Sequence, residues 1–291
     1  MQNIVPTIIS GIMVGAVYAL IAFGLSLLLG IMKFLNIAHG SFLILGGYIS
    51  YWMFKLWGVD PYLSIPLVII TIFVLGVILY KLTFSPLVRL PDVGKRIDNS
   101  LLITFGLVYV MDNVMTSIWS ANIRSITTFY TGGTLTIYNT KLSITGLCGL
   151  GIAALVAVAL YFIFSSTYFG KHVRAATEDA EAASLCGVNV ERTYLISCGI
   201  AVALAGVAGV VVLSSYSISA SGGMSWLLMG IVVMVLAGEG KLNTVLPAGL
   251  ILGIVQSLSI FIVGAPYRQA VALVIFIIVL MLRPQGLFSK G

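Results

Sequence analysis

Long apolar runs, separated by short polar stretches, make up most of this sequence. Two of the longest, residues 5–31 and 193–213, contain no charged side chain. About 20 apolar residues in a helix span the hydrocarbon core of a bilayer, so runs of this length predict transmembrane helices. Nine apolar segments are expected to be helical: 5–31, 42–57, 62–82, 100–119, 144–164, 193–213, 224–237, 243–263 and 265–282. Because the second and seventh are short enough to be re-entrant, the pattern predicts eight or nine crossings.

Small residues recur at four-residue spacing in three of these segments. They are Gly11 and Gly15, then Ala201, Ala205 and Gly209, and finally Gly249 and Gly253. Small side chains let two helix backbones approach closely in a membrane. Each pattern therefore predicts a face on which another helix packs.

The composition agrees with an integral membrane protein. Of the 291 residues, 60% are hydrophobic and 8% are charged, with a mean hydropathy of +1.13, whereas a soluble domain carries about 25% charged residues. No polar stretch is long enough to fold by itself, so we expect one all-α membrane domain over residues 1–291. Basic loops that face the cytoplasm and anionic lipid account for the net charge of +6, so no nucleic-acid partner is expected.

The basic residues predict an orientation. If the nine segments cross in alternation, eleven Lys and Arg residues fall on one side and four on the other. Basic residues are enriched in cytoplasmic loops, so we expect the N-terminus outside the cell and the C-terminus in the cytoplasm. The side with fewer cations holds Lys55, Arg124, Lys141 and Arg268.

The longest strongly polar segment, residues 170–192, falls on the predicted cytoplasmic side. Its centre, 177–186, predicts a short helix in which Thr177 is the N-cap. Three acidic residues would then lie in the first turn, where the helix dipole favours anions: Glu178, Asp179 and Glu181.

Gly187 is placed to end this short helix in a left-handed turn. Ala182 and Ala183 give the helix a small face that a second protein can approach closely. The segment is therefore expected to be a docking helix held in water between two spans. The alternative is a helix that only lies at the membrane surface.

Several stretches resemble a known family. Glu181-Ala182-Ala183, followed after three residues by Gly187, resembles the EAA loop of ABC importer permeases. The wider sequence is similar to the branched-chain amino-acid ABC permeases, in particular to the shorter of their two paralogous types. The stretches that carry this similarity are residues 34–48 (FLNIAHGSFLILGGY), 174–192, 204–210 (LAGVAGV) and 283–288 (RPQGLF).

The resemblance implies a function and a set of partners. Members of the family are permease subunits in a prokaryotic plasma membrane, and their EAA loop is a cytoplasmic coupling helix that docks into an ATPase subunit. The implied partners are two ABC ATPases that bind ATP and magnesium, a second, paralogous permease, and an extracytoplasmic substrate-binding protein. The implied cargo is leucine, isoleucine or valine, with other small neutral amino acids, urea and short amides as alternatives.

Motifs for catalysis and for nucleotide binding are absent from the sequence. There is no G-x-x-x-x-G-K-[ST] loop, G-x-S-x-G, H-E-x-x-H or C-x-x-C. We therefore expect neither an enzyme nor a chain that holds its own cofactor. The three cysteines, Cys148, Cys186 and Cys198, have no spacing that indicates a disulfide or a metal site.

A polar break at residues 36–41 provides candidates for a solute path. Asn36, His39 and Ser41 interrupt two apolar segments. Irregular polar backbone is tolerated at membrane depth only where it is buried in protein or lines a cavity. These side chains therefore either line a path or join two helices, unless the break is a hydrated turn at the membrane surface.

Asp112 is the fourth candidate, because an ionisable residue inside a span is usually functional and faces the interior. Its alternative role is an ion pair with Arg124 near the outer interface. An autonomous channel or a secondary transporter is the alternative function, and Asp112 and the polar break would suit it.

Residues 121–143 form a polar connection on the predicted outer side. The Thr/Ile alternation in TLTIYNTKLSI predicts a small β-hairpin around Asn139. This hairpin could dock an external binding protein or serve only as a lid.

Overall fold

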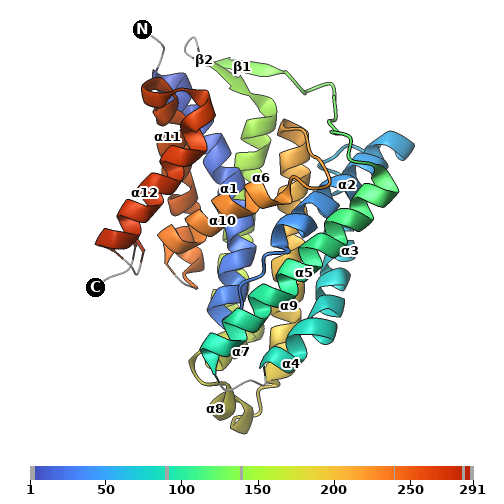
Figure 1. The fold of residues 1–291 in the computed structure, drawn as a ribbon, viewed down its shortest axis with the longest axis vertical. Helices are drawn as coiled ribbons and strands as arrows, with labels where there is room; N and C mark the ends of the chain where they lie inside the picture. The colour runs from blue at the N-terminus through green and yellow to red at the C-terminus, as the bar shows by residue number, and fades with distance from the viewer. Residues whose placement is uncertain (1–3, 89–91, 138–139, 239, 284–285, 289–291) are drawn as a thin grey trace.

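The computed structural model describes residues 4–88, 92–137, 140–238, 240–283 and 286–288. It is a bundle of helices with a small hairpin at one end (Figure 1). In these ranges, seven helical segments are long and apolar enough to cross a membrane. They are α1 (Ile4–Met32), α3 (Ile65–Leu79) with η1 (Tyr80–Phe84) and α4 (Ser85–Val88), α5 (Val93–Trp119), α6 (Ile144–Ser166), α9 (Val190–Ser215), α11 (Leu242–Val263), and η2 (Ala265–Tyr267) with α12 (Arg268–Leu282).

The two ends of the bundle carry different short elements. At the hairpin end, β1 (Thr134–Ile137) pairs antiparallel with β2 (Thr140–Ser143). The predicted hairpin is therefore confirmed, although Asn139 lies outside the described residues. At the opposite end, which we call the α8 end, α7 (Tyr168–Glu178) and α8 (Ala180–Leu185) project from the bundle (Figure 1).

The core of the bundle is formed by α1 and α9. In the most apolar stretch of each, 83% of the residues are buried, compared with 11% for α5 and 6% for α12. The helices α5 and α12 therefore lie at the periphery. Their exposed apolar side chains suit contact with lipid or with another membrane protein.

The predicted small-residue faces pack against neighbouring helices. A Cβ atom added at Gly15 would lie 2.4 Å from the Gly249 carbonyl oxygen, and one added at Gly253 would lie 2.2 Å from that of Gly11. Thus α1 and α11 meet backbone to backbone. A Cβ atom at Gly209 would lie 1.9 Å from the carbonyl oxygen of Leu43, so α9 meets α2 (His39–Trp57) in the same way.

Two further helices, α2 and α10 (Gly223–Ala237), begin inside the bundle rather than at its surface. The ring of His39 lies 3.2 Å from the carbonyl oxygen of Ile21, which is in the middle of α1. Gly223 touches Gly40, since a Cβ atom at Gly40 would lie 2.5 Å from the Gly223 oxygen. The first turns of the two helices therefore meet at mid-depth.

From this meeting point the two helices run to opposite ends. The C-terminal half of α2 reaches the hairpin end, where Tyr48 stacks on Trp119. The other helix, α10, leads to Gly240, which touches Gly30 near the end of α1 at the α8 end. Each helix is preceded by an irregular segment, residues 33–38 for α2 and 216–222 for α10, that enters the bundle from one end.

Several predicted boundaries were wrong; the third segment, for example, was expected to end at Leu82, but the helical segment continues to Val88. Two further errors concern the starts of helices. The second apolar segment was expected to begin at Phe42, but α2 begins at His39, so His39 and Ser41 belong to its first turn. The fourth was expected to begin at Ser100, but α5 begins at Val93. The Asp92 carboxylate accepts the backbone N–H of Gly94 at 2.8 Å. Because of this N-cap, the helix begins in the polar stretch that precedes the apolar run.

Candidate functional site

The projecting elements α7 and α8 contain the residues expected to couple to a partner. Thr177 was expected to cap the short helix, but it lies inside α7, where its hydroxyl donates to the Val173 carbonyl oxygen at 2.8 Å. Glu178 ends α7 and is not in the first turn of the next helix. The first helix begins instead at the cap Thr167, whose hydroxyl oxygen accepts the N–H of Gly170 at 3.1 Å.

The N-cap of α8 is Asp179. Its Oδ1 atom accepts the backbone N–H groups of Glu181 at 2.9 Å and Ala182 at 3.0 Å. Its extended backbone, with φ −151° and ψ 107°, separates α7 from α8. Glu181 lies in the first turn, as expected, where a carboxylate suits the helix dipole.

The C-terminal end of α8 is closed by Gly187, as predicted. Gly187 has φ +85°, in the left-handed region that favours glycine. Its N–H donates to the Ser184 oxygen at 3.0 Å, and the N–H of Val188 donates to the Ala183 oxygen at 3.0 Å. These bonds satisfy carbonyl groups at the helix end. The result is a six-residue helix fixed at both ends.

The outer surface of α8 differs from the small alanine face that the sequence indicated. Ala182 is exposed, but Ala183 is buried and cannot contact a partner directly. The side chain of Leu185 is 90% exposed. Sequence reasoning missed Leu185, although it is the single large aliphatic side chain between the two caps. An exposed leucine on a short capped helix is suited to contact with an apolar groove of another protein.

Helix α7 connects α8 to the core of the bundle. Val173 and Ala176 are buried on its inner face. The Tyr194 hydroxyl on α9 donates to the Ala176 carbonyl oxygen at 3.3 Å. The Arg174 guanidinium donates to the carbonyl oxygen of Phe164 on α6. Two hydrogen bonds, one buried and one exposed, therefore attach α7 to α9 and α6.

The candidate path residues lie near the mid-depth meeting of α2 and α10. Asn36, His39 and Ser41 are all buried, so the alternative of a hydrated turn at the membrane surface is wrong. The Ser41 hydroxyl donates to the Asp112 carboxylate at 2.8 Å, which joins α2 to α5. The proposed partner Arg124 instead donates to the Trp119 carbonyl oxygen at 2.9 Å.

Asn36 stands out among these residues. Neither its amide nitrogen nor its amide oxygen has a hydrogen-bond partner within the part of the chain that the structure describes. The Nδ1 atom of His39 is likewise without one. Buried polar groups are nearly always paired, because leaving one unpaired costs about 1–3 kcal/mol. The unpaired amide of Asn36 is therefore unusual for a group that is buried at mid-depth.

Together, the fold and these sites define a class: a polytopic membrane protein with helices that begin at mid-depth and a short projecting helix that is capped at both ends. The chain matches the family model described as the branched-chain amino acid transport system / permease component over residues 7–280. It belongs to this family, which confirms the assignment that its motifs indicated.

Curated relatives agree with the family assignment. The chain is 26% identical over 291 residues to the high-affinity branched-chain amino acid transport system permease protein BraD of Pseudomonas aeruginosa, covering 97% of this chain and 95% of that protein. It is 27% identical over 280 residues to the probable permease LivH of Methanocaldococcus jannaschii, covering 92% and 87%. It is 26% identical over 292 residues to LivH of Escherichia coli K12, covering 97% and 94%. No solved structure matches the chain.

These findings establish the general role of the protein. It is a multi-pass plasma-membrane protein of a transport-permease family. Permeases of ABC transporters work with ATPase and substrate-binding partners, so the protein is expected to act within a larger assembly.

Proposed function

We propose that this chain is the membrane-spanning subunit of an ATP-driven importer for branched-chain or other small neutral amino acids. The observation that carries the proposal is α8, a helix fixed by Asp179 and Gly187 that presents an exposed leucine. A surface of this kind is suited to receive movement from another protein. ATP and magnesium would bind to that partner, since the chain carries no nucleotide-binding loop.

The proposed assembly contains two ABC ATPases, this chain, a second paralogous permease and an extracytoplasmic binding protein. ATP-driven closure of the ATPases would displace α8, and α7 would pass the movement to α6 and α9. The α8 end is then cytoplasmic and the hairpin end external, as the basic residues predict. The helices α2 and α10, each with its preceding irregular segment, would complete nine passages of the membrane.

The solute would pass beside Asn36, His39, Ser41 and Asp112 at mid-depth. The unpaired amide of Asn36 supports this path, because it can donate to a carboxylate and accept from an ammonium group. The mainly apolar surroundings suit a solute without net charge. Unchanged uptake in an Asn36→Ala variant would contradict the path, and competition by charged solutes alone would contradict the solute class.

Co-purification tests the coupling assignment. In a Leu185→Glu variant, we expect binding of the ATPase subunit in detergent to fall about tenfold or more, because the leucine is the anchor and the new charge would be desolvated. Leu185→Met is the control, since it keeps an apolar side chain of similar size and should retain the ATPase.

Two results would reject the proposal. The first is full ATPase binding by both Leu185→Glu and Glu181→Lys, since both residues lie on the exposed surface of α8. The second is gradient-driven uptake by the purified chain without any ATPase subunit. That result would favour an autonomous channel or secondary transporter.

A further inference from the structure

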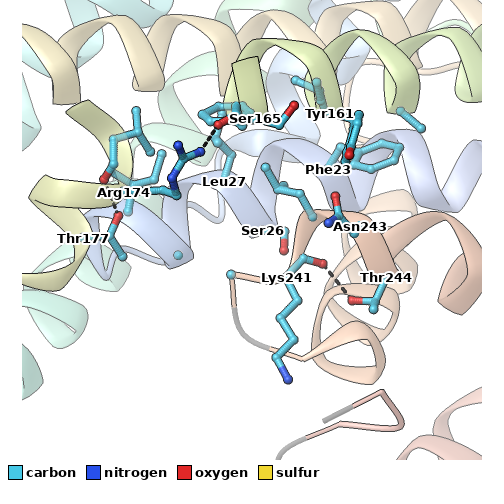
Figure 2. A pocket seen from close by; sticks show the side chains of 18 of the residues that line it. Phe23, Ser26, Leu27, Tyr161, Ser165, Arg174, Thr177, Lys241, Asn243 and Thr244 are labelled. Carbon is cyan, nitrogen blue, oxygen red and sulfur yellow. Dashed lines mark hydrogen bonds between the residues drawn. The ribbon is translucent and has the colours of Figure 1, made fainter. Parts of the chain in front are cut away.

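A large cavity lies at the α8 end, between α1, α6, α7 and the beginning of α11 (Figure 2). Its volume is about 1090 Å³. Typical pockets for small ligands hold about 300–1,000 Å³, so this cavity is larger than a single amino acid requires. One wall is apolar and includes Phe23 and Leu27 from α1 and Ala157 and Tyr161 from α6.

The apolar wall of the cavity continues onto the outer surface of the bundle. Val158, Tyr161 and Phe162 all line the cavity, yet each is more than half exposed. Only 17% of the most apolar stretch of α6 is buried, as expected for a helix that faces lipid. A hydrocarbon chain can therefore enter the cavity sideways from the bilayer without crossing the protein.

The polar side of the cavity carries a net positive charge. Lys33, Arg174 and Lys241 line it, with Glu178 as the one acidic lining residue among those described. Residues 242–244, the first turn of α11, also line it. A helix N-terminus offers unpaired N–H groups and a positive dipole end to an anion. Lys33, Lys241 and the start of α11 therefore make one part of the cavity wall cationic, and Arg174 adds a third positive charge on the α7 side (Figure 2).

Ser26 adds an independent indication of a ligand. Its side chain is fully buried, and its hydroxyl oxygen has no hydrogen-bond partner in the described ranges. Ser26 lines the cavity, and Figure 2 shows its hydroxyl on the side where Lys241 and Thr244 lie. A buried hydroxyl without a partner is available to an oxygen of a bound head group.

We propose that this cavity binds one anionic phospholipid from the leaflet at the α8 end. The phosphate lies near Lys33, Lys241 and the start of α11, Arg174 adds positive charge from the α7 side, and an acyl chain follows the apolar wall of α1 and α6. Charge complementarity and the lateral opening favour a lipid over a free amino acid. Cationic sites between membrane helices bind anionic head groups in this way.

Native mass spectrometry of the full-length chain in detergent tests the proposal. We expect one phosphatidylglycerol molecule to bind, and phosphatidylcholine to bind more weakly. Lys241→Gln and Lys33→Gln should each weaken phosphatidylglycerol binding about fivefold, as expected for one cation near a membrane surface. Lys95→Gln is the control, because Lys95 is an exposed cation that does not line the cavity; binding should not change.

A steric variant separates lipid binding from loss of a structural lysine. Ala157→Trp fills the apolar part of the cavity and should abolish phosphatidylglycerol binding while every cation remains. Ala159→Trp adds the same bulk to an exposed position of α6 that does not line the cavity, and should have no effect.

Three outcomes would overturn the proposal. One is undiminished phosphatidylglycerol binding in the Lys241→Gln and Ala157→Trp variants. Another is equal binding of phosphatidylcholine, which would show that the cations do not select the head group. The third is displacement of the lipid by millimolar inorganic phosphate, which would identify a free-anion site.

Discussion

Single side chains connect the broken helices of this protein to its outer helices. The hydrogen bond between the Ser41 hydroxyl and the Asp112 carboxylate, at 2.8 Å, joins the first turn of α2 to the peripheral helix α5. Asp112 is only partly buried, whereas Ser41 is buried. The contact therefore lies where the core meets the periphery, and it fixes the start of α2 against α5.

Substitutions at Asp112 distinguish the effect of its hydrogen bond with Ser41 on uptake from the effect of its negative charge. Asp112→Asn keeps an acceptor for Ser41, so we expect uptake of labelled leucine within about twofold of the wild type. Asp112→Leu leaves the Ser41 hydroxyl unpaired and should reduce the initial rate about tenfold, in line with about 1.5–3 kcal/mol for a bond to a charged group. The measurement is uptake into vesicles that contain the full transporter.

If Asp112→Asn reduced uptake as much as Asp112→Leu, the carboxylate charge itself would be required and the tethering role would be wrong. ATPase activity of the same preparations is the control for assembly.

At the scale of elements, the junction between α7 and α8 depends on one extended residue. Asp179 ends the first helix and caps the second through two bonds to backbone N–H groups. The turn at Gly187 fixes the other end. Helix α8 is therefore a separate helix and not a continuation of α7.

Removing this cap should weaken coupling without unfolding the bundle. Asp179→Ala loses both accepted bonds, a change that costs about 0.5–2 kcal/mol at an N-cap. We expect ATPase binding in a co-purification titration to weaken about fivefold. Asp179→Asn, which can cap equally well, should restore it. Failure of the asparagine variant would show that the carboxylate contacts the partner directly.

The sequence predicted those elements that depend on residues close to one another along the chain. The full-length apolar helices, the hairpin and the left-handed turn at Gly187 follow from hydrophobic runs, strand alternation and the conformational freedom of glycine. The cap was assigned to Thr177 rather than Asp179, because both residue types cap helices and only tertiary packing of Val173 and Ala176 extends α7 past Thr177.

Depth in the membrane was the main feature that the sequence did not reveal. A surface turn and a buried junction would have the same sequence pattern at Asn36, His39 and Ser41. Their burial follows from contacts with residues distant in sequence, such as Ile21 and Gly223. The exposure of Leu185 also depends on how α8 sits on the bundle, so hydrophobicity alone did not mark it as functional.

At the scale of the whole molecule, the native cysteines offer a direct test of orientation. Cys186 is exposed at the α8 end, whereas Cys198 is buried and Cys148 lies in α6. In a Cys148→Ser variant, a membrane-impermeant maleimide should label Cys186 in inside-out vesicles and not in intact cells. This follows if the side with more cations faces the cytoplasm.

A cysteine at the hairpin end provides the matched control. Phe129 is almost fully exposed there, so Phe129→Cys in a chain with its three native cysteines replaced by serine should be labelled in intact cells. Labelling of Cys186 in intact cells would reverse the proposed topology and remove α8 from the reach of a cytoplasmic ATPase.

The connection between residues 124 and 218 has a mechanical consequence. The two residues exchange a pair of backbone hydrogen bonds, each 2.8 Å long, and Ile218 belongs to the segment that leads into α10. A movement of the loop at Arg124 that leaves both bonds intact would therefore also move the segment that leads into α10. If the hairpin end is external, a protein that binds to this face and moves the loop would also move the segment that leads to the mid-depth start of α10.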